Sequence, residues 1–554
     1  MIRRARAEDW LLPLAPALLA GAHLTGLLLF LNPRVTVSVA ALARGSVAYG
    51  ALFALPSIAA HFAVAAARRV AVRRLLPWSL TLVAGAGATG DWVHASVYSF
   101  FLPRGIDVQL IKTALWLSFG GVVLFYTALL HTIHRRPYGA RSRLLVVLVT
   151  LGSVYAMFDR RIKFVPPEPV AARLLAVEPE IAPHTVVVEL AGATLDVLLP
   201  LAEQGKLPSV AGLLEAGAMA RLAGFPPPSR EALLASWATA KLPAEHGVTG
   251  DRVWLPAAFG PPGPLRLLPL SIGFEHWGLP GGRVRALGSG ERTALPVWDI
   301  LARSGRRTAV VNWPPSLADG GALALVPEAQ RLPPLRAEQA LEESGWPELS
   351  AALAGDRRAL ETARQALAGP APPEVVFVHL DGLERVALVA IGGFVHAEFE
   401  GSRAGESRRA ADAFITYLAG LDAELGALWE GLAPPRLLVV SSSYGVGAPG
   451  GAVRIWRELT GSRRTDGTLA GPVDGLLLMR GENVRLGVHL ADARIVDVAP
   501  TLLYALDLPI ARDFDGRVLA EAFEPALLQR RALAFVPSYE GMPASVVAPA
   551  TNVP

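Results

Sequence analysis

At 554 residues the chain is longer than one average domain, and with 52% hydrophobic residues and a mean hydropathy of +0.39 it is too apolar for an ordinary soluble protein. The net charge of +4 is small for this length, and no basic stripe interleaved with aromatic residues occurs, which argues against a nucleic-acid partner. The absence of cysteine excludes disulfides, thiolate metal sites and cysteine nucleophiles.

Five apolar segments in the first third of the chain predict membrane spans. They run over residues 10–31, 47–67, 78–102, 113–133 and 144–157. A span needs about 20 apolar residues, so the fifth is short. The first is followed by further apolar segments, which indicates an anchor and not a cleaved signal peptide. We therefore expect a polytopic membrane domain over residues 1–163.

Arginine clusters predict the orientation of these spans. The clusters are Arg3, Arg4 and Arg6, then Arg68, Arg69, Arg73 and Arg74, then Arg135, Arg136, Arg141 and Arg143. All three fall on one side of the membrane if every segment crosses. The positive-inside rule then places the N-terminus in the cytoplasm and the C-terminal domain outside the cytoplasmic membrane. Arg160, Arg161 and Lys163 after the fifth segment favour the opposite orientation.

One polar pair lies inside the predicted third span. In "GATGDWVHASVYSFF", Asp91 and His94 are three residues apart and therefore share a helix face. Ionisable groups within a span are functional candidates, which allows a role in a proton or lipid path. The alternative is a pair at the membrane interface beside aromatic anchors.

From about residue 164 the sequence alternates between strand-length apolar segments and longer segments of helical period. "HTVVVELAGAT", "EVVFVHLDG" and "RLLVVSSSYG" each predict a buried strand that runs into a turn. "LDVLLPLAEQGKLPSVAGLLEAGA" predicts two helices separated by a proline break. This pattern is typical of an α/β domain, which we place at residues 164–542, with a disordered tail at 543–554.

Four ordered blocks resemble a known family. They are "VVVELAGATLDVLLPLAEQGKLPSVAGLLEAGA", "FPPPSREALLASWATAKLPAEHGVTG", "VWDILARSGRRTAVVNWPPS" and "DVAPTLLYALDLPIARDFDGRVL". Together they resemble the type I phosphodiesterase/nucleotide pyrophosphatase branch of the alkaline phosphatase superfamily. The resemblance implies a central, mixed but mostly parallel sheet. In active members it also implies two zinc ions and a Ser or Thr nucleophile at the carboxyl ends of the strands.

The positions that match the family's metal ligands hold other residues in this chain. Ala191 stands where the first strand is followed by an Asp ligand, and Arg385 stands where a His ligand follows Asp381. The "SDHG" turn of the family is matched by Ser442 to Gly445, so Ser443 and Tyr444 replace an Asp and a His. Of six ligand positions only Asp381 is kept. Zinc needs three or four protein ligands, so no metal site and no cofactor is expected.

The nucleophile position is ambiguous by one residue. The resemblance places it nine residues before Thr239, at Arg230, and a one-residue insertion would restore Ser229. Ser229 is also a good helix N-cap. Asp381 is either a residual ligand or a partner of Arg385. We predict a metal-free pocket in which Arg385 pairs with Asp381 and Arg230 holds an anion beside Ser229. Ser443 and Tyr444 are expected to line the same cleft.

Two further alternatives stay open. Glu189 is either a substitute acid or a partnered core charge, and His379 with Asp381, His396 and Glu398 could form a relocated metal site. We predict a membrane-anchored pseudoenzyme with a binding or scaffolding role at the cell envelope. Its expected partners are membrane lipid and, in addition, envelope proteins or phosphate-bearing ligands. The alternative is an active phosphodiesterase or phosphotransferase acting on lipid-linked or envelope phosphate esters through a non-standard site.

Overall fold

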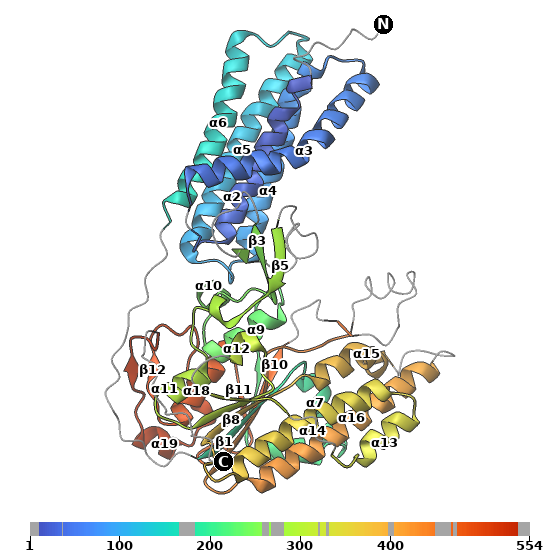
Figure 1. Cartoon of the computed structure of the whole chain (residues 1–554), viewed down its shortest axis with the longest axis vertical. Coiled ribbons are helices and arrows are strands. Elements are labelled where there is room, and N and C mark those ends of the chain that lie inside the picture. The colour runs from blue at the N-terminus through green and yellow to red at the C-terminus, as the bar shows by residue number, and fades with distance from the viewer. Residues whose placement is uncertain are drawn as a thin grey trace, which may run out of the picture. The chain divides into compact units, whose positions relative to one another are not determined.

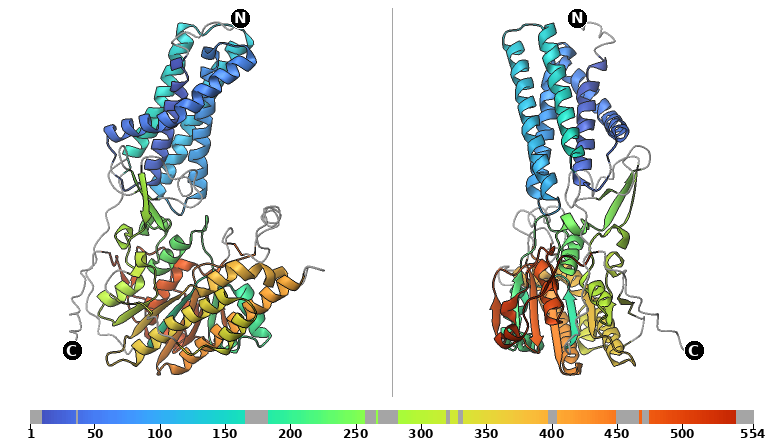
Figure 2. Two further views of the ribbon diagram at one scale, coloured as in Figure 1. Left: turned by 45° about the vertical axis from the view of Figure 1, so that its right-hand side comes forward. Right: turned by 90° about the vertical axis from the view of Figure 1, so that its left-hand side faces the viewer.

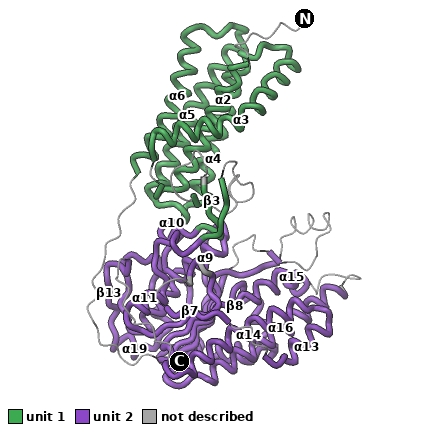
Figure 3. The backbone as a smooth tube through the Cα atoms, in the orientation of Figure 1, with its two compact units in different colours: residues 1–168, 249–287 green, residues 169–248, 288–554 purple. Residues whose placement is uncertain are grey.

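The structure is a computed structural model of the whole chain (Figure 1). It describes residues 10–35, 37–164, 183–256, 265–266, 282–318, 322–327, 332–396, 404–448, 467–468 and 474–540. The predicted tail at 543–554 and Glu398 lie outside this part of the chain. Two compact units are distinguished in Figure 3, one comprising residues 1–168 and 249–287, the other residues 169–248 and 288–554. Each is described by itself below.

The first unit is built on long helices, seen as blue to cyan ribbons in Figure 2. They are α2 (Leu14–Leu31), α3 (Val39–Arg68), α4 (Leu76–Val97), α5 (Arg104–Ile133) and α6 (Ala140–Ile162), with a 3-10 turn at Val72–Arg74. The predicted series of long apolar helices is confirmed. Among the described residues, four helices are long and apolar enough to cross a bilayer: α2, α3, α5 and α6. The protein is therefore a candidate multi-pass membrane protein.

Four of the five expected spans meet this length and hydropathy criterion. The fifth segment, predicted to be short, forms the 23-residue helix α6, which is long and apolar enough to cross a bilayer. Helix α4 is the one that does not meet the criterion, because its sequence is rich in small residues and contains Asp91 and His94. Small residues allow close helix packing: a Cβ added to Gly87 would lie 2.4 Å from Nδ1 of His23 on α2.

A small antiparallel sheet completes the first unit. Its strands are β3 (Arg252–Pro256), β4 (Leu265–Arg266) and β5 (Gly282–Ala286), in the order β4-β3-β5. The backbone N–H of Arg266 donates to Oδ1 of Asn32, 2.7 Å away at the end of α2. Residues far apart in sequence are thereby joined in one unit.

The second unit is an α/β domain around an eight-stranded sheet of order β11-β2-β10-β9-β1-β8-β6-β7. Its strands are β1 (His184–Leu190), β2 (Ala218–Leu222), β6 (Thr308–Val311), β7 (Leu323–Leu325), β8 (Val375–Leu380), β9 (Arg436–Ser442), β10 (Gly475–Gly481) and β11 (Val488–Leu490). Only the pairs that involve β10 with β2 and β9 are antiparallel. The predicted mixed, mostly parallel sheet is confirmed. A separate parallel pair joins β12 (Ile510–Ala511) and β13 (Phe535–Val536).

Helices cover both faces of this sheet. They are α7 (Leu195–Glu203), α8 (Pro208–Glu215), α9 (Arg230–Thr239), α10 (Pro243–His246), α11 (Val297–Arg303), α12 (Pro315–Ala318), α13 (Arg336–Glu343), α14 (Pro347–Ala368), α15 (Gly382–His396), α16 (Ala404–Gly431), α18 (Val498–Ala505) and α19 (Pro525–Arg530), with 3-10 turns at Ser289–Glu291, Ile495–Asp497 and Ala520–Ala522. Alternate residues of β1, such as Val186 and Val188, pack with α14, α15 and α16 in the main core. These three helices gather on one side of the sheet in Figure 1.

The opposite face of the sheet packs against tryptophans. Phe377 of β8 has its ring centre 5.5 Å from Trp298 of α11 and 6.5 Å from Trp237 of α9. Strand residues alternate between faces, so Glu189 and His379 point to this second face as well. The two polar residues therefore lie beside an aromatic layer, and not in the aliphatic core.

One buried arginine holds the end of α2 in the first unit. Arg161 of α6 is 3% exposed, and its Nε donates to the carbonyl oxygen of Leu29 at 2.6 Å. Its Nη2 donates to the carbonyls of Asn32, Pro33 and Val35 at 3.2, 2.8 and 2.9 Å. The last carbonyls of a helix lack partners within the helix, and a cation there is favourable.

Arg161→Met should destabilise the first unit, because it removes the donor of four hydrogen bonds from a charged group. Hydrogen bonds of this kind contribute about 1.5–3 kcal/mol, so we expect the melting temperature of the full-length protein in nanodiscs to fall by several degrees. Arg160→Met is the matched control, since Arg160 makes one 3.4 Å hydrogen bond to the carbonyl of Ala156 and a 5.9 Å cation–π contact with Trp116. Equal melting of the two variants would contradict this role of Arg161.

Candidate functional site

Three parallel strands at the centre of the second unit end side by side. In the register of the sheet, Glu189 of β1 is level with His379 of β8 on one side and Ser441 of β9 on the other. Ser443 follows β9 directly. The carboxyl ends of these strands are where ligands of open α/β sheets bind, and here they bring together acidic, basic and hydroxyl side chains.

Glu189 is the centre of the first polar group. Its side chain is fully buried, and Nδ1 of His379 lies 2.7 Å from its Oε2. The two atoms form an ion pair by distance, although their orientation is poor for a hydrogen bond. Its other oxygen, Oε1, accepts hydrogen bonds from the backbone N–H of Ser443 at 3.1 Å and from the Ser443 hydroxyl at 3.0 Å. Of the two readings of Glu189, this geometry is that of a partnered core charge.

His379 supplies the positive charge. Burial lowers the pKa of His379, but the contact with Glu189 raises it more, and the carboxylates of Asp381 and Glu384 add to this, so the net pKa is raised. The ring also lies 5.3 Å from the ring of Trp313, in the aromatic layer. An imidazole with a raised pKa, paired with a carboxylate, therefore lies where the resemblance leads one to expect the surroundings of a metal.

Glu384, on the first turn of α15, is the centre of a second polar group. Its Oε2 accepts from the Tyr444 hydroxyl at 2.9 Å and from Nη1 of Arg230 at 3.3 Å. Arg230 also pairs with Glu231 at 3.0 Å. Burial lowers the pKa of Arg230, but the charges of Glu384 and Glu231 raise it more. The guanidinium is thus fully charged and held between two carboxylates.

A left-handed glycine joins the two groups. Gly192 follows Ala191 with φ of 84°, and a bridge links it to Gly445, next to Tyr444. A Cβ at this position would lie 3.0 Å from Cα of Glu384. The turn after β1 therefore needs glycine both for its backbone conformation and for the close approach of α15.

The remaining predicted site residues lie as follows. Ser229 is the N-cap of α9, and its Oγ accepts from the N–H of Ala232 at 3.5 Å. Asp381 and Arg385 form a 2.9 Å ion pair whose side chains are 42% and 57% exposed, in that order. Arg385 is therefore within salt-bridge distance of Asp381, whereas Arg230 faces carboxylates.

A buried carboxylate that the sequence analysis did not single out is Asp356 of α14. Its Oδ1 accepts from the N–H of Gly382 at 3.1 Å, and the Tyr417 hydroxyl donates to its Oδ2. Burial raises the pKa of Asp356 to about 7. A Cβ on Gly382 would lie 2.1 Å from Oδ2, so glycine is required there. The available signal was an acidic residue at an apolar position of the helical sequence pattern over residues 347–368.

The donor set does not fit the two zinc ions of active relatives. Ala191 has no donor atom, the Ser443 hydroxyl is bound to Glu189, and the Tyr444 hydroxyl is bound to Glu384. Within the residues that the structure describes, no three His, Asp or Glu side chains are grouped as metal ligands. The side chains of His396 and Glu398, from the suggested relocated site, lie outside the described part of the chain.

The polar pair of the helical unit is buried. Asp91 and His94 are 4% and 1% exposed, and Nδ1 of His94 donates to the carbonyl of Gly90 at 2.7 Å. Asp91 Oδ2, His94 Nε2 and both ring nitrogens of His23 have no partner among the described residues. The sequence analysis missed His23, which contacts α4 at Gly87. Both residues of the pair are therefore enclosed within the helical unit.

Fold and strand-end site together define an alkaline-phosphatase-like α/β domain that follows apolar helices. Residues 185–458 match the sequence model of the type I phosphodiesterase / nucleotide pyrophosphatase family, and this segment of the chain belongs to that family. The resemblance inferred from the four blocks is thereby confirmed. No curated protein sequence matches the chain.

Several solved structures are similar in fold. Murine ectonucleotide pyrophosphatase/phosphodiesterase 5 has 12% identity and a TM-score of 0.37, covering 59% of this chain and 95% of its own. Phosphonoacetate hydrolase from Sinorhizobium meliloti 1021 has 13% identity and a TM-score of 0.33, covering 62% and 99%. A mutant of alkaline phosphatase PafA has 11% identity and a TM-score of 0.39, covering 63% and 100%. At these scores the likenesses assign no role to any residue.

The Glu189–His379 pair should make stability depend on pH. A histidine whose pKa is raised by folding contributes its full stability below the unfolded pKa of 6.5 and loses it as the pH rises through the folded pKa. We expect the free energy of unfolding to fall as the pH rises above 6.5. Asp356, whose pKa is raised to about 7, also contributes to this fall, so the share of His379 is the part of the slope that its replacement removes.

Urea unfolding at several pH values measures this dependence. His379→Gln should reduce the slope above pH 6.5, because it removes one of the titrating groups and leaves only the contribution of Asp356. His489→Gln, at an exposed histidine, is the control and should keep the wild-type profile. A wild-type slope that persists in His379→Gln would refute the assignment.

Proposed function

We propose that this protein is a membrane-anchored, non-hydrolytic member of the family, which acts by binding at the cell envelope. One observation carries the proposal: the residues at the ligand positions are bound to neighbouring side chains of the same domain. Ser443 is bound to Glu189, Tyr444 to Glu384, and Arg385 to Asp381. Converting this site to metal binding would require breaking all three contacts.

The charges at the strand ends also disfavour a phosphate ester. Four carboxylates, those of Glu189, Glu231, Glu384 and Asp381, face three cationic groups, those of His379, Arg230 and Arg385. In an active member the metal ions neutralise the phosphoryl oxygens and stabilise the leaving oxygen. Here the carboxylates exceed the cations, so a phosphate would meet net repulsion. Binding of envelope proteins by the domain surface agrees better with this balance.

We further propose that the N-terminus is cytoplasmic and the α/β domain is outside. The three arginine clusters support this orientation. Of the three basic residues that favour the opposite orientation, Arg161 and Lys163 have partners within the first unit. Arg161 is bound to the carbonyls at the end of α2, and Lys163 pairs with Asp159 at 2.7 Å. Helix α4 has 22 residues, about 33 Å at 1.5 Å per residue, and can reach across a bilayer with its polar residues facing inward.

Reporter fusions test the orientation. Alkaline phosphatase fused after Arg74 or Arg143 should be inactive, because both positions are expected in the cytoplasm, while a fusion after Lys163 should be active. Green fluorescent protein fusions at the same positions should give the complementary pattern. A fluorescent, phosphatase-inactive fusion after Lys163 would reverse the proposed orientation, whatever the other two show.

Metal content and hydrolysis test the non-catalytic role. We expect the full-length protein, purified in nanodiscs after growth with zinc and manganese, to contain far less than one metal ion per chain. We also expect no hydrolysis of nitrophenyl phosphate mono- or diesters above background, equally in wild type and Ser229→Ala. Stoichiometric metal with turnover that Ser229→Ala abolishes would instead establish the active phosphodiesterase.

A further inference from the structure

A groove far from the strand-end site opens between α8, α16 and β10. Its volume is about 280 Å³, slightly below the range of about 300–1,000 Å³ typical of pockets for drug-sized ligands. Buried leucines from three elements line it: Leu213 of α8, Leu425 of α16 and Leu438 of β9. Trp429 of α16 and Arg480 of β10 also line the groove.

Arg480 provides a free charge in this apolar setting. Its guanidinium carbon lies over the Trp429 ring, 4.5 Å from the ring centre. The half-buried side chain has no ion pair or hydrogen bond with any residue that the structure describes. A guanidinium over an aromatic face keeps its in-plane N–H groups available for an oxyanion.

Arg436 packs on the same Trp429 ring, but its guanidinium is engaged in hydrogen bonds. Its guanidinium carbon is 3.9 Å from the centre of the Trp429 ring, but its Nη1 donates to the carbonyls of Trp429 and Leu432 at 2.7 and 3.3 Å. Those bonds close the end of α16. Of the two arginines on this ring, Arg480 is thus the one whose donors remain available.

The other polar groups of the groove fit an anionic ligand. Ser209 contributes a hydroxyl donor, and Glu430 is the single carboxylate among the lining residues. Glu430 is exposed, so water and salt screen its charge, whereas the half-buried guanidinium of Arg480 acts in a less polar surrounding. The interior of the groove is therefore positive and its walls are apolar.

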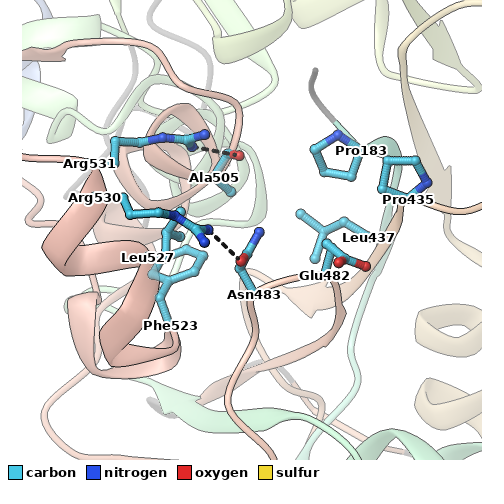
Figure 4. Close-up of a pocket in the computed structure, with 10 residues that line it drawn as sticks. All are labelled: Pro183, Pro435, Leu437, Glu482, Asn483, Ala505, Phe523, Leu527, Arg530 and Arg531. Atoms are coloured by element: carbon cyan, nitrogen blue, oxygen red, sulfur yellow. Dashed lines mark hydrogen bonds between the residues drawn. The ribbon is translucent and has the colours of Figure 1, made fainter. Parts of the chain in front are cut away.

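A second cavity, shown in Figure 4, differs from this groove in its volume and in the contacts of its arginines. It lies at the amino ends of β1 and β9, beside Pro183 and Pro435, and has a volume of about 70 Å³. Both of its arginines are engaged: Arg530 donates to Oδ1 of Asn483 at 3.3 Å, and Arg531 pairs with Asp507 at 2.9 Å. No comparable free cation lines that cavity.

We propose that the groove binds a small amphiphilic oxyanion, a carboxylate or phosphate carrying a short apolar group. The oxyanion is held in paired hydrogen bonds by the guanidinium of Arg480, with the Ser209 hydroxyl as a further donor. The apolar group lies against Leu213, Leu425 and the edge of Trp429. This site is independent of the strand-end residues, so it holds whether or not those residues catalyse a reaction.

Calorimetric titration of the full-length protein in nanodiscs, corrected for empty nanodiscs, tests the proposal. The probes are hexanoate and monobutyl phosphate, with hexan-1-ol and inorganic phosphate as single-feature controls. Both amphiphilic anions, or one of them, should bind. Each control should bind at least about tenfold more weakly, because hexan-1-ol lacks the oxyanion and inorganic phosphate lacks the apolar group. The stronger of the two anions identifies the head group as carboxylate or phosphate.

Three variants locate the binding. Arg480→Gln should weaken it about tenfold or more by removing the charge. Gly212→Ala should also weaken it: the new methyl lies 3.4 Å from Nη1 of Arg480, and alanine favours the helix, so folding is preserved. Arg512→Gln changes a guanidinium 5.7 Å from the Phe535 ring and should leave affinity unchanged. Absence of binding by both anions, or equal affinity in wild type and Arg480→Gln, would overturn the proposal.

Discussion

The α/β domain depends on one buried charge having a partner. Glu189 lies on β1, in the interior of the sheet, and is wholly inaccessible to solvent. An unpaired carboxylate at such a place would cost several kcal/mol, so the fold requires a cation or donors within reach. The parallel register supplies them: it sets His379 level with Glu189 on the neighbouring strand, and the turn after β9 adds Ser443. The pair and the register stabilise one another.

The same principle explains how a domain of this family can hold its strand ends without the metal ions of active members. A bimetal site draws several acidic and imidazole side chains together around positive charge. In this chain protein cations take that position: His379 faces Glu189, and Arg230 faces Glu384, which Tyr444 also contacts. The site is therefore a satisfied polar network, which rigidifies the turns but leaves few free donors or acceptors.

Much of this could be predicted from the sequence, and the limits have physical causes. Strands such as β1 and β8 were found because continuous apolar runs are typical of a buried parallel sheet. The contact of Arg385 with Asp381 was foreseeable, since it spans one helical turn. Contacts between distant segments were not: Arg230 and Glu384 are 154 residues apart, and local patterns contain no information about such pairs. Helix α4 shows a different limit of prediction. Its small residues make the helix long enough to span a membrane, but they are less apolar than the residues of the neighbouring helices.

The central claim is that protein side chains, and not metal ions, balance the charges at the strand ends. Anomalous X-ray scattering at the zinc edge, from crystals of the full-length protein soaked in zinc, tests it directly. The account predicts no zinc peak near Asp381 or between Ala191 and Ser443, with the Glu189–His379 contact intact. A pair of zinc peaks at these strand ends, with the Ser229 hydroxyl in contact and His379 turned away from Glu189, would contradict it.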